Sequence, residues 1–148
     1  MAKRYQKMLL AVDFHEDNAE VIAAARELRE LYGAELHLVH VNEPLGMAYA
    51  ADGVSWGDQV YALEASIRKE SEKKMNELKA ELGLTDDQCH LLEGRPSSQI
   101  HELAEQNRFD LIVLGTHGQH GLQLLLGSTA NSVLHGASCD VLAIRLRD

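Results

Sequence analysis

Residues 110–118 read Asp110-Leu111-Ile112-Val113-Leu114-Gly115-Thr116-His117-Gly118. The run 111–114 is apolar at every position, which is typical of a parallel strand covered by helices on both faces. The stretch that begins at Gly115 and ends at Gly118 is typical of a turn or loop. The segment therefore predicts an interior strand that ends at Leu114 and runs directly into a glycine-containing loop.

Short apolar runs on either side of this segment alternate with amphipathic stretches, which is the pattern of βαβ units. We expect the other four strands at 8–12, 36–41, 89–92 and 141–146. Four helices are expected over 17–32, over 59–82, after Pro96, and over about 128–135. Residues 42–58 are rich in Gly, Ala, Ser and Asp and predict a long loop. The chain is thus expected to be one domain over 1–148, a doubly wound, Rossmann-like α/β fold with five parallel strands in the order 3-2-1-4-5.

Composition limits the classes of function. The chain has 148 residues, a net charge of -9 and no cluster of Lys and Arg, which argues against a nucleic-acid surface. No apolar stretch reaches the roughly 18 to 20 residues of a membrane helix, and no export signal is found. Cys89 and Cys139 are expected to be buried free thiols. We therefore expect a cytoplasmic protein without membrane insertion.

In the expected strand order the first and fourth strands are neighbours, and the loops that follow them diverge to open a crevice. Asp13 and Gly115 both fall at this edge. Gly127-Ser128-Thr129 precedes a helix whose first N–H groups have no partner within the helix, which suits an anion. The residues leave two interpretations open: a phosphate site, or glycines that merely turn the chain and a serine that merely caps the helix.

Other nucleotide motifs are missing or incomplete. A P-loop requires a Lys before the Ser or Thr, and no Lys or Arg occurs between Gly115 and Thr129. The first expected strand is not followed by GxGxxG. Only fragments of the residue set of a phosphotransfer receiver domain are present.

The chain resembles the universal stress protein family. The resemblance covers essentially the whole chain, and its residues are Ala11-Val12-Asp13, His40-Val41, Gly94-Arg95-Pro96, Gly115-Thr116-His117-Gly118 and Gly127-Ser128. Nucleotide-binding members carry the pattern G-x2-G-x9-G-[ST], and here eight residues rather than nine separate Gly118 from Gly127.

This resemblance implies that the chain binds ATP, with Mg²⁺ entering on the triphosphate. By similarity, Asp13 and the backbone near Val41 lie on the adenosine side, and residues 127–129 lie on the phosphates. The full expected set is Ala11, Val12, Asp13, Val41, Leu114, Gly115, His117, Gly118, Gly127, Ser128 and Thr129. No protein-held metal is expected, and strand alternation sends His37 and His40 to opposite faces of the sheet.

The function expected from these residues is regulatory. The motif has no Lys or Arg to stabilise a transferring phosphoryl group, so binding should dominate over hydrolysis. An apolar edge strand over Cys139 to Leu146 favours pairing across a two-fold axis, and a homodimer is also what the resemblance implies. Two alternatives remain: a nucleotide-free docking dimer, and a slow ATPase that uses His117. The client protein is unknown.

Overall fold

The computed structural model describes residues 4–14, 18–45, 57–117 and 128–146. These residues form a parallel sheet of five strands in the order β3-β2-β1-β4-β5. The strands are β1 (Lys7–Ala11), β2 (Glu35–Asn42), β3 (Cys89–Glu93), β4 (Leu111–His117) and β5 (Asp140–Leu146). The helices are α1 (Ala19–Tyr32), α3 (Gly57–Leu82), α4 (Pro96–Gln106) and α5 (Ser128–Gly136), with a short 3-10 turn, η1 (Asp86–Gln88), before β3. The predicted fold class and strand order are confirmed.

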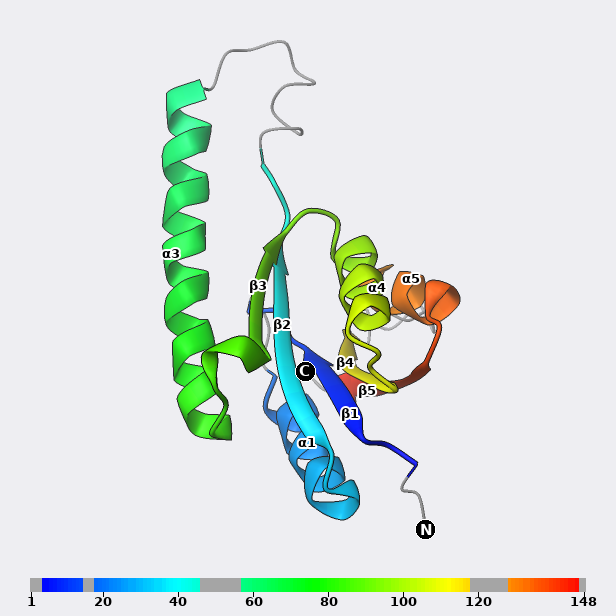
Figure 1. Cartoon of the computed structure of the whole chain (residues 1–148). Helices are drawn as coiled ribbons and strands as arrows, with labels where there is room; N and C mark the ends of the chain where they lie inside the picture. The colour runs from blue at the N-terminus through cyan, green and yellow to red at the C-terminus, as the bar shows by residue number, and fades with distance from the viewer. Residues whose placement is uncertain (1–3, 15–17, 46–56, 118–127, 147–148) are drawn as a thin grey trace.

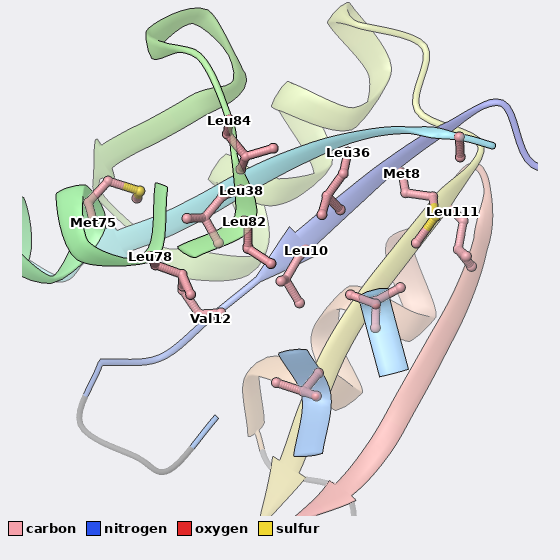
Figure 2. Packing of buried hydrophobic residues seen from close by; sticks show 14 of the residues in the cluster. Met8, Leu10, Val12, Leu36, Leu38, Met75, Leu78, Leu82, Leu84 and Leu111 are labelled. Atoms are coloured by element: carbon pink, nitrogen blue, oxygen red, sulfur yellow. The ribbon is translucent and has the colours of Figure 1, made fainter. Parts of the chain in front are cut away.

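Helices cover both faces of this sheet (Figure 1). Successive side chains of a strand point to opposite faces, so Met8 and Leu10 of β1 face α1 and α3, whereas Leu9 and Ala11 face α4 and α5. The apolar cluster on the α1 and α3 side is drawn in Figure 2; the residues labelled there are Met8, Leu10, Val12, Leu36, Leu38, Met75, Leu78, Leu82, Leu84 and Leu111. This cover on both faces explains the uninterrupted apolar runs of β1 and β4.

β4 continues for three residues beyond the predicted end. Gly115, Thr116 and His117 belong to the strand rather than to a loop, because they pair with residues 144–146 of β5. Gly115 is tightly packed in this pairing. A Cβ atom added to it would lie 2.8 Å from Cδ1 of Leu146, so the position has no room for a side chain unless Leu146 moves.

The helix ends agree with the sequence at most positions. Gly33 and Gly83 end α1 and α3 with φ angles of 61° and 65°, a conformation that glycine adopts without strain. Pro96 is the first residue of α4, as predicted. The start of α1 differs from the prediction, because its N-cap is Asn18 and Asp17 lies outside the described residues. The side chain of Asn18 donates to the carbonyl oxygen of Asp13 at 2.8 Å instead of capping the helix.

α3 is packed on the sheet only over part of its length. Met75, Leu78 and Leu82 are buried, whereas Leu63 is 45% exposed and Tyr61 is 77% exposed. The end of α3 that carries Tyr61 extends past the sheet in Figure 1. The apolar residues of the helix predicted over 59–82 therefore form core in its carboxyl-terminal half. Most of the predicted loop, 46–56, lies outside the described residues.

The two cysteines carry free thiols and are half-buried, not fully buried as predicted. Burial raises the pKa of both thiols. Within the described part of the chain, no helix combines the length and the apolar character needed to cross a bilayer.

Candidate functional site

The carboxyl ends of β1 and β4 meet at the centre of one sheet edge. Ala11, the last residue of β1, is in register with Leu114, and β4 continues for three residues beyond this level. After β1 the chain leads to α1 on one face, and after β4 it leads to α5 on the other. Ligands of open α/β sheets bind at such a switch point, outside the carboxyl ends of the strands. The structure therefore brings the β1 and β4 groups of the predicted site together.

The apolar residues predicted for the site lie at the carboxyl-terminal end of the sheet, below its surface. Ala11, Val12, Val41 and Leu114 are all buried. Both backbone polar groups of Val12 have partners inside the protein: its N–H donates to the carbonyl oxygen of Val39 at 3.0 Å, and its carbonyl oxygen lies 2.8 Å from Nδ1 of His40. Val12 is therefore a buried structural residue of the site. The residue next to it, Asp13, is exposed.

The structure describes only some of the residues predicted for the glycine-containing half of the site. Ser128 and Thr129 are the first two residues of α5, where backbone N–H groups point away from the helix without an intrahelical acceptor. Gly115 and His117 are residues of β4. Gly118 and Gly127 lie outside the described residues, so the contacts predicted for them stay predictions. The described groups offer hydroxyl, carboxylate and backbone N–H partners, which is chemistry for binding a polar ligand through hydrogen bonds.

A polar network at the end of β2 was missed by sequence reasoning. His40 lies 2.9 Å, through Nε2, from Oδ1 of Asn42, and Oγ of Ser71 on α3 lies 2.9 Å from the same oxygen. From the same helix, Nζ of Lys74 donates to the carbonyl oxygen of Phe14 at 2.9 Å. These residues are remote in sequence, and no motif spacing connects them. The network joins α3 to the segment that follows β1.

A cleft of about 460 Å³ lies between α3 and β3, and it too was not expected. Asn42, Arg68 and Lys79 are among its lining residues. Two ion pairs lie in the lining of the cleft: Arg68 pairs with Glu93 at 2.6 Å, and Lys79 pairs with Asp86.

Two further histidines lie together on the opposite face of the sheet from His40. Nδ1 of His37 is 3.0 Å from Nε2 of His90, and Nε2 of His37 is 2.6 Å from a carboxylate oxygen of Glu35. His37 and His40 are therefore on opposite faces, as strand alternation predicted. Among the residues that the structure describes, no group of three or more His, Cys, Asp or Glu side chains is arranged to hold a metal ion.

We expect the histidine pair to make stability depend on pH. Burial lowers the pKa of His90 below the ordinary 6.5, with smaller contributions in the same direction from His37 and Lys7 and an opposing one from Asp87. The folded state therefore binds fewer protons than the unfolded state, and stability falls as pH drops through about 6.5. Urea unfolding at pH 7.5 and pH 5.5 measures this loss. The loss should shrink in His90→Gln and persist in His135→Gln, which alters an exposed histidine of α5; an equal loss in all three proteins would contradict the assignment.

Comparison with known proteins identifies the family. The model of the universal stress protein family matches residues 4–145. Universal stress protein A homolog 2 of Coxiella burnetii is 42% identical over 145 residues, covering 97% of each chain, and homolog 1 of the same organism is 40% identical, covering 97% of this chain and 99% of the other.

Solved structures of the same fold agree. The hypothetical protein MJ0577 superposes with a TM-score of 0.76 at 24% identity, covering 98% of this chain and 99% of the other. A universal stress protein in complex with cAMP superposes with a TM-score of 0.59 at 20% identity, covering 95% of this chain and 97% of the other. With the sheet order, the matched family model and these relatives taken together, the chain belongs to the universal stress protein family.

Proposed function

We propose that this protein is a cytoplasmic, ATP-binding regulator of the stress response that acts as a homodimer and hydrolyses ATP slowly or not at all. The observation that carries the proposal is the switch point between the neighbouring strands β1 and β4, which are followed by helices on opposite faces of the sheet. A universal stress protein with this fold is in complex with cAMP, so the fold accommodates an adenine nucleotide. ATP occupancy would change the shape or assembly of the protein, and a client protein would sense that change.

The residues at the edge fit the parts of ATP in this proposal. Asp13, which is exposed beside the buried Val12 and Val41, accepts a hydrogen bond from the ribose or the adenine amino group. Residues 127–129 hold the phosphates through the N–H groups and hydroxyls at the start of α5. Mg²⁺ enters with the triphosphate, whose oxygens are its main ligands.

Asp13→Ala should weaken ATP binding about tenfold, because a hydrogen bond to a charged group contributes about 1.5–3 kcal/mol. Isothermal titration calorimetry of the purified protein with Mg-ATP measures the dissociation constant. Glu105→Ala is the matched control: it also removes one exposed carboxylate, but from the end of α4, and it should leave the affinity unchanged.

Mass spectrometry of small molecules released by denaturation tests the same proposal without added ligand. Absence of any adenine nucleotide, together with no heat on titration with Mg-ATP, would overturn ATP binding and favour a nucleotide-free docking dimer. Turnover of ATP that disappears in His117→Ala would favour an ATPase.

The homodimer forms through β5 in this proposal. β5 is the last strand of the sheet order and pairs with β4 along one side. Its residues 141–144 are apolar and half-buried. An apolar edge strand of this kind tends to pair with another strand, and antiparallel pairing with a second copy satisfies both edges at once.

A further inference from the structure

The imidazole of His40 is held on three sides. The side chain is 5% exposed, on the α1 and α3 face of the sheet. Its Nδ1 lies 2.8 Å from the carbonyl oxygen of Val12, and its Nε2 lies 2.9 Å from Oδ1 of Asn42. Its ring packs on the ring of Phe14, with centroids 4.3 Å apart. The imidazole therefore contacts the segment that carries Asp13 at the residue before it and at the residue after it.

The partner of Nδ1 determines where the proton sits. A carbonyl oxygen can only accept a hydrogen bond, so Nδ1 of His40 carries a hydrogen and donates it to Val12. In a neutral imidazole Nε2 is then an acceptor. It faces Oδ1 of Asn42, which is also an acceptor, and two acceptors at 2.9 Å do not form a hydrogen bond.

The side-chain amide of Asn42 also has unsuitable hydrogen-bond partners. Its Nδ2 is buried and has no hydrogen-bond partner, whereas its Oδ1 faces both His40 and Ser71. Rotating the amide by half a turn places Nδ2 at 2.9 Å from Nε2 of His40 and from Oγ of Ser71, so that both N–H groups gain acceptors. In this orientation Oδ1 takes the position that Nδ2 leaves, where a carbonyl oxygen is tolerated better than an unpaired donor, and Nε2 of the neutral imidazole faces a donor; we assign the orientation on that ground.

The result is a chain of hydrogen bonds from α3 to the end of β1. It runs from Ser71, which is 5% exposed, through Asn42 and His40 to the carbonyl oxygen of Val12. Lys74 lies three residues after Ser71 on the same helix and binds the carbonyl oxygen of Phe14 separately. The side chain of Val12 also belongs to the apolar cluster that contains Met75 and Leu78 of α3 (Figure 2). The segment 12–14 is therefore held by α3 through polar and apolar contacts.

We propose that His40 is the positioning residue of the nucleotide site, and that through Asn42 and Ser71 it couples the adenosine side of that site to α3. This inference rests on the proposed function, since it assigns a role in ATP binding to a residue that lies beneath Asp13. A nucleotide that binds Asp13 favours one position of the segment 12–14 and thereby one packing of α3. By linkage, a change in the packing of α3 alters the affinity for ATP by the same factor. The exposed Tyr61 and Leu63 lie on the same helix, so the change reaches the surface.

His40→Leu should raise the dissociation constant of Mg-ATP about tenfold, because the carbonyl of Val12 loses its donor and the segment 12–14 its support. His40→Asn should keep the affinity within about threefold, since the amide nitrogen of Asn occupies the position of Nδ1 and still donates to Val12. His37→Leu is the matched control. It removes an equally buried imidazole from the same strand but from the other face, and it should lower stability without changing the affinity.

The coupling to α3 is tested with Ser71→Ala and Lys74→Met. Each change should weaken ATP binding although neither residue lies at the carboxyl edge of β1 or β4. In a double-mutant cycle, Ser71→Ala should have less effect on affinity in the His40→Leu background than in the wild type, because the connection is already broken. Additive effects would overturn the chain from Ser71 to Val12.

A measurement without nucleotide separates this proposal from the function on which it rests. Long-range proton–nitrogen NMR spectra of the protein labelled with [¹⁵N]histidine should show the hydrogen of His40 on Nδ1. The amide signals of Asp13 and Phe14 should move in His40→Leu and stay in His37→Leu. A hydrogen on Nε2 with a bare Nδ1, or unmoved Asp13 and Phe14 signals, would overturn the positioning role. Failure of the wild type to bind ATP, with these spectra as expected, would overturn the proposed function instead.

Discussion

Gly115→Val should lower the free energy of unfolding by about 1–3 kcal/mol, the usual cost of overfilling a packed site. The new Cβ would lie 2.8 Å from Cδ1 and 2.9 Å from Cγ of Leu146, and the two further methyl groups of valine add to the crowding. Leu146 is 7% exposed and belongs to the apolar cluster under α1, so it cannot simply turn into solvent. Urea unfolding followed by circular dichroism measures the loss.

The double variant Gly115→Val with Leu146→Ala provides the control. Removing the leucine side chain makes room for the valine, so the double variant should be more stable than the sum of the two single losses predicts. Strictly additive losses would show that Leu146 is not the obstacle. The double variant also distinguishes two reasons for the glycine. If a close approach of ATP requires it, ATP affinity stays reduced after stability has recovered.

Ala143→Pro should convert the proposed dimer into a monomer of 16.4 kDa. Proline in β5 removes a backbone N–H and disturbs the edge that the second copy would use. Size-exclusion chromatography with light scattering gives the mass. A dimer mass that persists in both Ala143→Pro and Leu142→Pro, or a wild type that is itself monomeric, would contradict pairing through β5.

Leu142→Pro is the companion variant, because it distinguishes loss of the dimer from loss of the fold. Successive residues of a strand point their N–H groups alternately toward the neighbouring strand and outward, so one of the two prolines faces β4 and the other faces the partner. The proline with the outward position should yield a folded monomer. The other should lower the melting temperature by removing a bond of the β4–β5 ladder.

The sequence predicts the layers of the fold because burial on both faces leaves a strong signal. The runs around Leu10 and Val113 are apolar at successive positions, and only a strand with helices on both sides buries them all. Gly33 and Gly83 predict the helix ends because a left-handed residue is needed there. The strand order is expected because right-handed crossovers on five parallel strands leave few topologies, of which 3-2-1-4-5 is the common one.

The predicted end of β4 was wrong, and the apolar residues of α3 are only partly buried, because both features depend on contacts with segments that are distant in the sequence. Gly115-Thr116-His117 has no strand pattern of its own and extends β4 because residues 144–146 run beside it. Leu63 is an apolar residue in the amino-terminal third of α3, the end of the helix that extends past the sheet in Figure 1, and it is 45% exposed. Periodicity reports which face of a helix is apolar, not whether another element covers that face.

In the candidate site, too, some features could be predicted from the sequence and others depend on residues that are distant in the chain. Its position at the ends of β1 and β4 could be predicted, because topology alone brings Asp13 and Leu114 to one edge. The support beneath it could not. His40 and Val12 are 28 residues apart and Asn42 and Ser71 are 29 apart, and each side chain is an ordinary polar residue in its local sequence. The pairing of β1 with β2 brings His40 to Val12, and the packing of α3 on the sheet brings Ser71 to Asn42.

The central place of β1 affects the order in which the sheet can be completed during synthesis. Its partner on one side, β2, follows directly after α1, whereas its partner on the other side, β4, begins only at Leu111. The bonds between Lys7 and Asp110 close a loop of 103 residues, and pairing at such separation slows folding. A nascent chain that has formed β1, β2 and β3 therefore presents the unpaired side of β1 as an open edge. Such an edge invites aggregation until β4 is made, so the central strand is also the one most in need of protection on the ribosome.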